Sequence, residues 1–403
     1  MTSNTRVVVI GAGLAGVRLA RRLGELGTPV TLVGEEEHRP YNRVLLAEVL
    51  AGRYTPDVIA LPAPAALTRA RVTGIDRGAR TVACADGSKI AYDTLVLATG
   101  SNPVLPPLRG LFTADHELPK GVHAFRTMDD CLGLSEAVRP GVKAVVIGGG
   151  LLGVSAARAL AQRGAQVILA QQSERLMERQ LDPSASKLVR RHLGDLGVEV
   201  HTDLRVRDVR CVGGAVRSVE MADGYTLDAE IVVLACGVHP RVGLAQAAGL
   251  DVRKGIVVDD ELRTSDPHIH AVGDCAQHAG TVYGLATPAL EQADALAELL
   301  AGRADARYTG TRSLTRLTLT GQTAFDLAAF GETEALPGDD VVQLADATRG
   351  TYRKVVVRDD RLVGGVLVGE LGTVGALARA WEGAEPLPAG GPLLHLLTND
   401  GGS

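Results

Sequence analysis

The sequence of 403 residues predicts an α/β fold with two similar domains, followed by a smaller α+β domain. Three observations predict it: an internal repeat at a fixed offset, a glycine-rich turn between a strand and a helix in each copy, and a change of pattern after about Tyr308. At roughly 150 residues per domain, this length allows two or three domains with sizeable cores.

The repeat shifts the chain by 137 positions, the distance from Gly11 to Gly148. Internal repeats of this kind indicate duplicated structural units. The matched stretches are VVVIGAGLAG at 7–16 with AVVIGGGLLG at 144–153, VTL at 30–32 with VIL at 167–169, LVLATG at 95–100 with VVLACG at 232–237, and Pro103 with Pro240. Several matches at one offset indicate two copies of one domain.

Each copy opens with an apolar strand, a G-x-G-x-x-G turn, a helix (about 12–27 and 151–164) and a second apolar strand. The first glycine of such a turn makes the bend, the second lets backbone approach a pyrophosphate, and the third lets helix pack on strand. A lone motif could be a purely structural turn, but this strand and helix context predicts two Rossmann-like dinucleotide-binding domains. The predicted turn residues are Gly11, Ala12, Gly13, Leu14, Ala15 and Gly16, then Gly148, Gly150, Leu151, Leu152 and Gly153.

The end of the second strand in each copy carries the residue expected at the adenosine ribose. Glu35 stands 19 residues after the third glycine, where a carboxylate can accept both ribose hydroxyls. The alternative is a solvated acidic cluster with Glu36 and Glu37. The second copy has Gln172 there and Arg175 three residues later. The missing carboxylate removes the usual repulsion of a 2′-phosphate, but one arginine does not define a phosphate pocket, so NADH and NADPH stay undistinguished.

Two further motifs, LATG at 97–100 and AVGD at 271–274, complete a family resemblance. With the two glycine turns, they resemble the two-dinucleotide flavoproteins typified by glutathione reductase, over about residues 6–300. The stretches HRPYNRVLL at 38–46 and RLMERQLD at 175–182 are similar to the FAD/NAD(P)H module of assimilatory nitrite reductase large subunits and related ferredoxin and rubredoxin reductases.

The resemblance implies FAD at the first site and NAD(P)H at the second. It implies an FAD-binding domain formed by residues 1–113 and 241–307, an NAD(P)H-binding domain at 114–240, and a C-terminal α+β interface domain at 308–403. The cofactor-binding residues that it implies beyond the turns are Glu35, Glu36, Arg43, Val72, Ala98, Thr99, Gly100, Gly273, Asp274 and Thr287 for FAD, with Gln172 and Gly237 for NAD(P)H.

Three of these residues have stated roles in the resemblance. Asp274 would bond a ribityl hydroxyl of the flavin, although an aspartate there could instead cap the next helix. Arg43 would lie beside the flavin or its phosphates, although a surface arginine is the alternative. Thr287 is expected as the N-cap, with Pro288 at the first helical position, of a helix over 289–301 aimed at the flavin, where its dipole would favour negative charge on the reduced ring.

The sequence departs from the family pattern at its cysteines. Disulfide reductases of this fold carry a cysteine pair just after the first acidic residue, but residues 41–50 contain none. We therefore expect neither disulfide reduction nor thiolate-dependent peroxidase chemistry. All five cysteines are expected to be packing residues: Cys84, Cys131, Cys211, Cys236 and Cys275.

A second departure concerns the nicotinamide. Relatives often carry a glutamate two residues after the third glycine of the second turn, near the nicotinamide, sometimes paired with a lysine five residues after the counterpart of Arg43. This sequence has Ser155 and Glu48 at those positions, which leaves open how the nicotinamide is held. We expect Glu48 on a helix surface; the alternative is that it replaces the lost carboxylate.

Beyond about Tyr308 the sequence alternates between short strands, and 352–358 and 361–368 flank Asp359 and Asp360 as a predicted hairpin. In the family such a domain packs beside the flavin, forms a dimer interface or docks the electron acceptor. Because the ligands of iron-sulfur and siroheme regions are missing, we expect any nitrite-reducing centre to lie on another polypeptide.

Composition excludes several partners. With 42 Lys and Arg against 47 Asp and Glu, the net charge of -5 supplies no basic field for nucleic acid. No apolar run approaches the roughly 18 residues of a membrane span, and residues 1–6 lack the pattern of a signal peptide, so we expect a soluble cytoplasmic protein. No C-x-x-C spacing occurs, so no metal site is expected.

The predicted function is that of an FAD-dependent NAD(P)H oxidoreductase in which the flavin, and no particular side chain, carries the chemistry. We expect it to pass electrons to an acceptor protein, as in nitrite or nitrate reductase systems or ferredoxin and rubredoxin reductases, and a homodimer is possible. The alternatives are an NAD(P)H oxidase that forms hydrogen peroxide and a flavoprotein that senses NAD(P)H without turnover.

Overall fold

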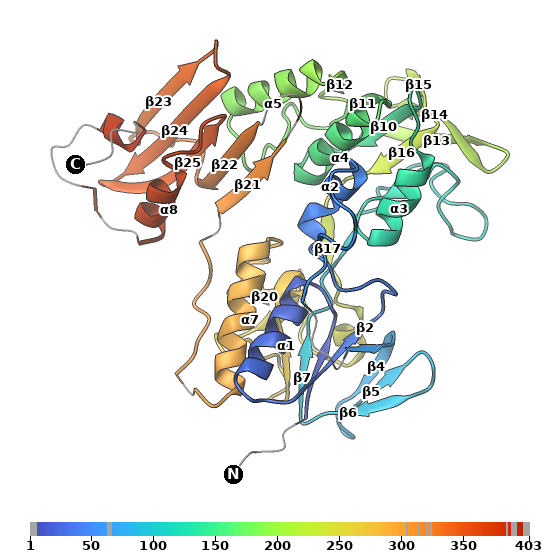
Figure 1. The fold of residues 1–403 in the computed structure, drawn as a ribbon, viewed down its shortest axis with the longest axis vertical. Coiled ribbons are helices and arrows are strands. Elements are labelled where there is room, and N and C mark those ends of the chain that lie inside the picture. Colours follow the sequence, from blue (N-terminus) through green and yellow to red (C-terminus); the bar gives the residue numbers. More distant parts are fainter. Residues whose placement is uncertain are drawn as a thin grey trace.

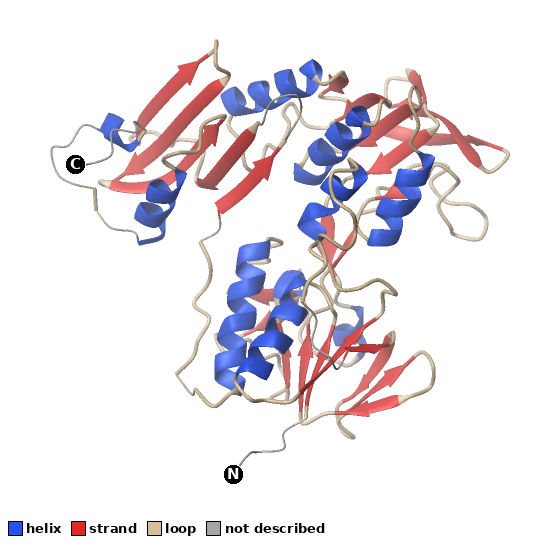
Figure 2. Cartoon of the chain, viewed as in Figure 1, coloured by secondary structure: helices blue, strands red, loops and turns tan. Residues whose placement is uncertain are grey.

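Two parallel sheets and one antiparallel sheet, each of five strands, make up most of the structure (Figure 1, Figure 2). This confirms the predicted α/β class with a C-terminal α+β domain. The computed structural model describes residues 6–62, 67–303, 305–312, 314–319, 321, 325–383, 386–387 and 393–397. The expectation that residues 1–6 form no signal peptide falls mostly on residues 1–5, which lie outside the described residues. No helix among the described residues is long and apolar enough to cross a membrane.

The first parallel sheet has the order β19-β7-β1-β2-β3. Its strands are β19 (Ile269–Ala271), β7 (Thr94–Leu97), β1 (Val7–Ile10), β2 (Val30–Gly34) and β3 (Leu67–Arg69). The four residues of β1 are all buried, as expected of a parallel strand covered on both faces. Helices α1 (Leu14–Glu25) and α7 (Ala286–Leu300) lie side by side against this sheet (Figure 1), and Arg18 binds Asp294 between them through two hydrogen bonds of 2.6 and 2.8 Å.

The second parallel sheet has the order β12-β11-β10-β16-β9. Its strands are β12 (Val198–His201), β11 (Gln166–Ala170), β10 (Lys143–Ile147), β16 (Ile231–Leu234) and β9 (Val122–Ala124), with helices α3 (Met128–Ala137), α4 (Leu151–Gln162) and α5 (Pro183–Asp195). Small antiparallel sheets extend both halves: β4 (Val72–Asp76), β5 (Thr81–Cys84) and β6 (Lys89–Ala91) in the first, and β13 (Val206–Val212), β14 (Ala215–Met221) and β15 (Thr226–Asp228) in the second.

The hydrogen-bond register confirms the repeat. In the first sheet Val7 pairs with Val30 and with Thr94, and in the second Ala144 pairs with Val167 and with Ile231. Every residue of the second set lies 137 positions after its counterpart in the first. Because side chains alternate along a strand, an equal register gives both copies the same pattern of buried positions.

A short antiparallel pair joins the two copies. Strands β8 (Ser101–Pro103) and β17 (Val238–Pro240) bond to each other, with Asn102 opposite His239. These two residues are counterparts in the repeat, 137 positions apart. The two halves are therefore related by a local twofold arrangement at this joint.

Residues 41–59, which we call the strap, pack with the second half although they precede it by far in the sequence. The strap contains a short 3-10 turn (Arg43–Leu45) and helix α2 (Leu46–Leu50), which lies against α3 and α4 (Figure 1). Its buried apolar residues share one hydrophobic core with the second sheet and its helices. The strap thus packs with helices and strands that come after residue 113 in the chain.

The C-terminal sheet has the order β21-β22-β25-β24-β23. Its strands are β21 (Leu314–Thr318), β22 (Asp326–Gly331), β23 (Asp340–Asp346), β24 (Thr351–Arg358) and β25 (Arg361–Val368), and helix α8 (Val374–Gly383) packs against β25 and β22. The predicted hairpin is confirmed: Asp359 and Asp360, both with positive φ, form the turn between β24 and β25.

The C-terminal sheet packs on the second half of the molecule. Tyr352 and Val366 belong to the same core as the residues of α5. At the start of α5, the buried Asp182 accepts hydrogen bonds from the Tyr352 hydroxyl and, at 3.1 Å, from Lys354. The family resemblance left three places for this domain, and the structure joins it to the second sheet by a shared core.

The remaining short elements are α6 (Gly243–Ala247), β18 (Ile256–Val258), the 3-10 turn Gly273–Cys275, β20 (Ala276–His278) and the 3-10 turn Leu393–Leu396. The two helices after the glycine turns were expected over about 12–27 and 151–164; they span Leu14–Glu25 and Leu151–Gln162, again at the same offset.

Candidate functional site

The predicted residues of the first half gather at one edge of the first sheet. They follow the carboxyl ends of four neighbouring strands: Glu35 and Glu36 follow β2, the turn at 11–16 follows β1, Ala98 to Gly100 follow β7, and Gly273 and Asp274 follow β19. This edge of an open α/β sheet is where such folds bind ligands. Val72 lies apart as a buried core residue of β4, directly after Arg71, which is 3.8 Å from the Glu35 carboxylate.

The predicted residues of the second half lie at the matching edge of the second sheet. The turn at 148–153 follows β10, Gln172 comes two residues after β11, and Gly237 follows β16. Gln172 and Gly237 are both exposed. The structure thus assembles two equivalent edges from two equivalent sets of segments.

At the first and third positions of the turns, close backbone contacts within the chain require glycine. A Cβ on Gly11 would lie 2.1 Å from the Ala98 carbonyl oxygen, and one on Gly148 would lie 2.4 Å from that of Ala235. Both glycines also have a positive φ, near +110°. A Cβ on the third glycine, Gly16, would lie 1.9 Å from the Gly11 carbonyl oxygen, so this glycine permits close helix packing.

At the second position of each turn, no contact within the chain requires glycine. Gly13 and Gly150 have extended backbone as the N-caps of α1 and α4, and no heavy atom lies within 4 Å of the place a Cβ would take. Each therefore leaves open space in front of a helix N-terminus. A dinucleotide pyrophosphate needs that space and the free N–H groups beside it, so the residues present fit a dinucleotide at both edges.

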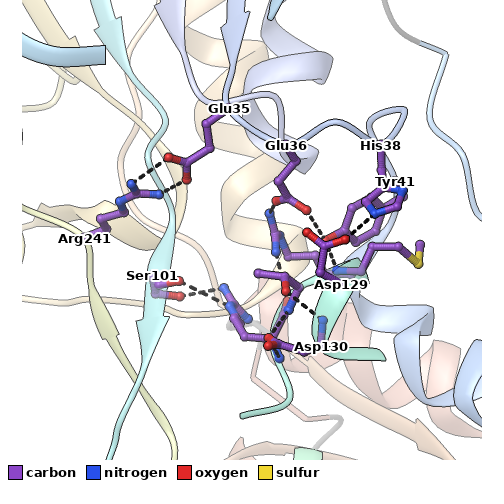
Figure 3. A network of polar contacts seen from close by, with 12 residues as sticks. Glu35, Glu36, His38, Tyr41, Ser101, Asp129, Asp130 and Arg241 are labelled. Carbon is purple, nitrogen blue, oxygen red and sulfur yellow. Dashed lines mark hydrogen bonds and ion pairs between the residues drawn. The ribbon is translucent and has the colours of Figure 1, made fainter. Parts of the chain in front are cut away.

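Glu35, expected at the adenosine ribose, is held by an arginine that the sequence analysis did not single out. Arg241 binds both carboxylate oxygens of Glu35, one at 2.9 Å (Figure 3). This hydrogen bonding lowers the pKa of Glu35. The backbone of Arg241 is fixed in turn, since its N–H donates to Gly100 and its carbonyl accepts from the Thr99 hydroxyl at 2.7 Å. The carboxylate is thus ionised and oriented as a hydroxyl acceptor.

A second polar network includes Glu36 and Tyr41 (Figure 3), and Arg43 belongs to it. Arg43 forms an ion pair with Glu36 and donates to the Arg126 carbonyl at 2.9 Å. The Tyr41 hydroxyl donates to Glu36 at 2.7 Å, and burial raises the pKa of that hydroxyl. Arg43 is therefore half-buried and paired, unlike the free surface arginine that was its alternative.

Asp274 lies in the same region and contacts the start of the second half. Arg126 donates to the Asp274 carboxylate at 2.8 Å and to the Ser101 hydroxyl at 2.6 Å. Ser101 also donates to Asp274 at 2.8 Å. Arg126, Ser101 and Arg241 are polar residues at this edge that sequence reasoning missed, because each is a common residue type that belongs to none of the motifs.

The sequence predicted Thr287 as the N-cap of its helix, and this prediction is wrong. Helix α7 begins at Ala286, after Leu285, which has extended backbone and makes no side-chain cap. Thr287 and Pro288 therefore lie inside the first turn. Proline is tolerated there because the N–H groups of that turn have no partner within the helix. The helix remains tied to the first edge, since Gln292 accepts the Gly273 N–H at 2.7 Å.

At the second edge, Gln171 rather than Gln172 contacts the glycine turn. Its side-chain oxygen accepts the Gly149 N–H at 2.7 Å. Arg175, the candidate for a 2′-phosphate, instead forms an ion pair at 2.8 Å with Glu334 of the C-terminal domain. In this structure the Arg175 guanidinium is therefore paired with a carboxylate of the C-terminal domain.

Glu48 and Ser155 also differ from expectation. Glu48 is not on a helix surface: it forms an ion pair with Arg158 of α4, whose side chain is 0% exposed, while the Glu48 side chain is 15% exposed. The Ser155 hydroxyl donates to the Leu151 carbonyl at 2.8 Å within its own helix. The positions that carry a glutamate and a lysine in relatives thus hold a different arrangement here.

The five cysteines form no disulfide with one another, and they differ in burial. All five are free; Cys84, Cys131 and Cys275 are buried, but Cys211 is exposed, which corrects the expectation that all five are packing residues. Burial raises the pKa of Cys131 and of Cys236 to about 11. At pH 7 such thiols are ionised in only about one molecule in ten thousand.

We expect a thiol reagent such as iodoacetamide to modify Cys211 first and to leave NAD(P)H-dependent flavin reduction unchanged. Mass spectrometry identifies the modified residue, and reduction is followed before and after treatment. Cys211→Ser is the matched control, since it should take up less reagent under the same conditions. A loss of reduction that parallels the modification would show that a thiol takes part.

Comparisons with known proteins agree with this geometry. The model of the pyridine nucleotide-disulphide oxidoreductase family matches residues 5–293, and that of the rubredoxin NAD+ reductase C-terminal domain matches residues 315–382. The chain is 35% identical to the assimilatory nitrate reductase electron transfer subunit of Bacillus subtilis, over 91% of this chain and 48% of that protein. It is 31% identical to a probable ferredoxin reductase of Castellaniella defragrans, over 90% of both chains.

Among solved structures, putidaredoxin reductase in its covalent complex with putidaredoxin is similar, with a TM-score of 0.86 and 27% identity over 98% of this chain and 99% of that chain. The chain spans about half the length, or less, of the nitrate and nitrite reductase relatives. Two matched turns, two equivalent edges and these relatives agree: the chain belongs to the pyridine nucleotide-disulphide oxidoreductase family, as an FAD-dependent NAD(P)H oxidoreductase.

Proposed function

We propose that this protein takes a hydride from NAD(P)H held at the second edge onto FAD held at the first, and passes the electrons to an acceptor protein. The observation that carries the proposal is the open space in front of Gly13 and Gly150, one at each edge. Bound FAD supplies the ability to accept two electrons together and release them singly. The residues of the chain bind the two cofactors, orient them and shield them from water.

In this proposal each group at the first edge has a task. Glu35 accepts the ribose hydroxyls of the adenosine, oriented by Arg241. Asp274 bonds the ribityl chain, and Arg126 forms an ion pair with the Asp274 carboxylate. Arg43 supplies positive charge next to the flavin or its phosphates. The N-terminus of α7 presents unpaired N–H groups to the reduced ring.

The second edge holds NAD(P)H in the same proposal. The turn at 148–153 and the start of α4 bind its pyrophosphate. Gln172 and Gly237 line the adenosine and nicotinamide ends. The division into an FAD domain (1–113 and 241–307), an NAD(P)H domain (114–240) and a C-terminal domain (308–403), the homodimer and the cytoplasmic location stay predictions.

The acceptor class follows from the relatives. Proteins similar over most of this chain are described as an electron transfer subunit of nitrate reductase, a probable ferredoxin reductase and rubredoxin-NAD(+) reductases. We therefore propose a one-electron acceptor protein, of the nitrite or nitrate reductase system or a ferredoxin or rubredoxin. All five cysteines are free, and none lies in residues 41–50, where disulfide reductases carry their pair, so we do not propose a disulfide substrate.

A sequential-mixing experiment separates this function from its two alternatives. The protein is first reduced anaerobically by NADH or NADPH, then mixed with ferredoxin, with rubredoxin or with oxygen, while flavin absorbance is followed. The proposal predicts fast reoxidation by a carrier protein and slow reoxidation by oxygen. Fast reoxidation by oxygen with formation of hydrogen peroxide would indicate the oxidase, and slow reduction in the first step would indicate the sensor.

The choice between NADH and NADPH is expected to depend on Gln172. Gln172→Glu would restore a carboxylate at the ribose position, where it accepts the hydroxyls of NADH and repels the 2′-phosphate of NADPH. We expect the ratio of kcat/KM for NADH over that for NADPH to rise at least tenfold. Glu178→Gln, an exposed change in the same loop, is the control and should leave the ratio unchanged. An unchanged ratio in the Gln172 variant would mean that the ribose lies elsewhere.

A further inference from the structure

The strap at 41–59 and helix α4 are joined by a buried ion pair. Arg158 is among the largest fully buried side chains of the described chain, at 0% exposed. Its guanidinium donates to the Glu48 carboxylate, and also contacts Gln162 one turn later in α4 at 3.4 Å. Burying a guanidinium is costly unless it is paired and hydrogen-bonded, and Glu48 supplies an ionic partner for Arg158.

The pair connects the two candidate sites through secondary structure. Glu48 lies in α2, a few residues after Arg43, which contacts Glu36 at the first edge. Arg158 lies in α4, whose N-cap is Gly150 of the second turn. One ion pair therefore links the segment that borders the first edge to the helix that begins at the second.

The pair lies too far from the second turn to touch a nucleotide there. Arg158 is eight residues after Gly150 along α4, a rise of roughly 12 Å. It contacts the rest of the core instead: the positive charge of Arg158 contributes to the lowered pKa of His192 in α5, after the larger effect of burial. Glu48 has a second partner, Arg53 of the strap, at 3.2 Å.

We propose that Glu48 and Arg158 are positioning residues, which fix α4 against the strap and thereby set the distance between the nicotinamide and the flavin. This inference rests on the proposed function. Hydride transfer requires the reacting atoms about 3–3.5 Å apart, and a misplacement near 1 Å can cost on the order of a hundredfold in rate. A directional ion pair holds two helices in one relative position more tightly than apolar contact, which tolerates sliding.

The test must separate positioning from simple stability. Glu48→Gln removes the carboxylate charge beside the buried Arg158. It should therefore weaken both the positioning of α4 and the stability of the protein. The double variant E48L/R158M removes both charges and fills similar volume, and replacements of this kind are often neutral for stability. Glu48→Asp keeps both charges and shortens one arm by a methylene. Glu230→Gln, which disrupts the exposed pair with Arg139, is the matched control.

Each variant is loaded with FAD and reduced anaerobically by NAD(P)H and, separately, by dithionite, which needs no nicotinamide site. For E48L/R158M and Glu48→Asp we expect the unfolding temperature and the rate of reduction by dithionite to match those of the wild type. The dissociation constant for NAD(P)H should stay within about threefold of the wild-type value. Hydride transfer should be at least tenfold slower than in the wild type. Glu230→Gln should match wild type throughout. Wild-type hydride transfer in both pair variants would overturn the positioning role. Absence of reduction in the wild-type protein would instead overturn the proposed function.

Discussion

Gly150→Asp is expected to give a protein that folds normally and binds FAD but needs NADH or NADPH at concentrations on the order of a hundredfold higher to be reduced. No atom lies within 4 Å of the new Cβ, and the backbone of Gly150 is extended, so the aspartate fits. Aspartate is among the best N-cap residues, and its charge suits the helix dipole, so stability should stay equal or rise by about 1 kcal/mol.

The same carboxylate would face the pyrophosphate of the nucleotide. Two like charges roughly 5 Å apart repel by about 3 kcal/mol at an effective dielectric constant near 20. We therefore expect NAD(P)H affinity to fall on the order of a hundredfold or more. Nucleotide titration, thermal unfolding and flavin content check the three parts of this prediction.

The duplicated fold supplies the matched control. Gly13→Asp is the same change at the equivalent N-cap of the first half, and it should abolish FAD binding instead. If Gly150→Asp lost FAD and Gly13→Asp kept it, the assignment of the two cofactors to the two edges would be reversed. If neither change affected any nucleotide, the open spaces would not be binding sites.

Gly11→Ala is expected to destabilise the first half itself, by about 3 kcal/mol or more. Its Cβ would lie 2.1 Å from the carbonyl oxygen of Ala98, which is backbone next to the central strands and cannot rotate away. The positive φ of +111° adds strain on the order of 1–3 kcal/mol for a residue with a side chain. Thermal and urea unfolding of the FAD-free protein measure this loss without any contribution from the cofactor.

Gly24→Ala is the control for that change. Gly24 lies within α1, has no heavy atom within 4 Å of a new Cβ and is exposed. Alanine favours helix over glycine by about 1 kcal/mol, so this variant should be equally or more stable. Equal unfolding curves for Gly11→Ala and wild type would mean that the turn adopts another conformation.

The duplicated architecture could be predicted from the sequence because its signals are local. A strand, a G-x-G-x-x-G turn and a helix occupy contiguous residues, and their recurrence at one offset fixes two sheets with the same register. The hairpin at Asp359 and Asp360 is equally local, since two residues of positive φ suffice to close it. The candidate edges follow from this topology, because parallel strands from one sheet end together.

The contacts between distant segments could not be predicted in this way. Glu48 and Arg158 are 110 residues apart, and a charged residue on a short helix is more often exposed than buried. Arg241 reaches Glu35 over 206 residues without any motif. Thr287 was expected to cap α7 by its residue type, but the backbone of Leu285 starts the helix earlier. In each case tertiary packing decides which of several common side-chain roles is realised.

The most direct test of the central claim is anaerobic stopped-flow reduction of the FAD-loaded protein by NADH and NADPH, each with hydrogen or deuterium at the transferred C4 position. We expect flavin absorbance to bleach at a rate between about 1 and 1000 per second with at least one coenzyme, and more slowly with the deuterated form. Failure of both coenzymes to bleach the flavin would contradict hydride entry through the second edge.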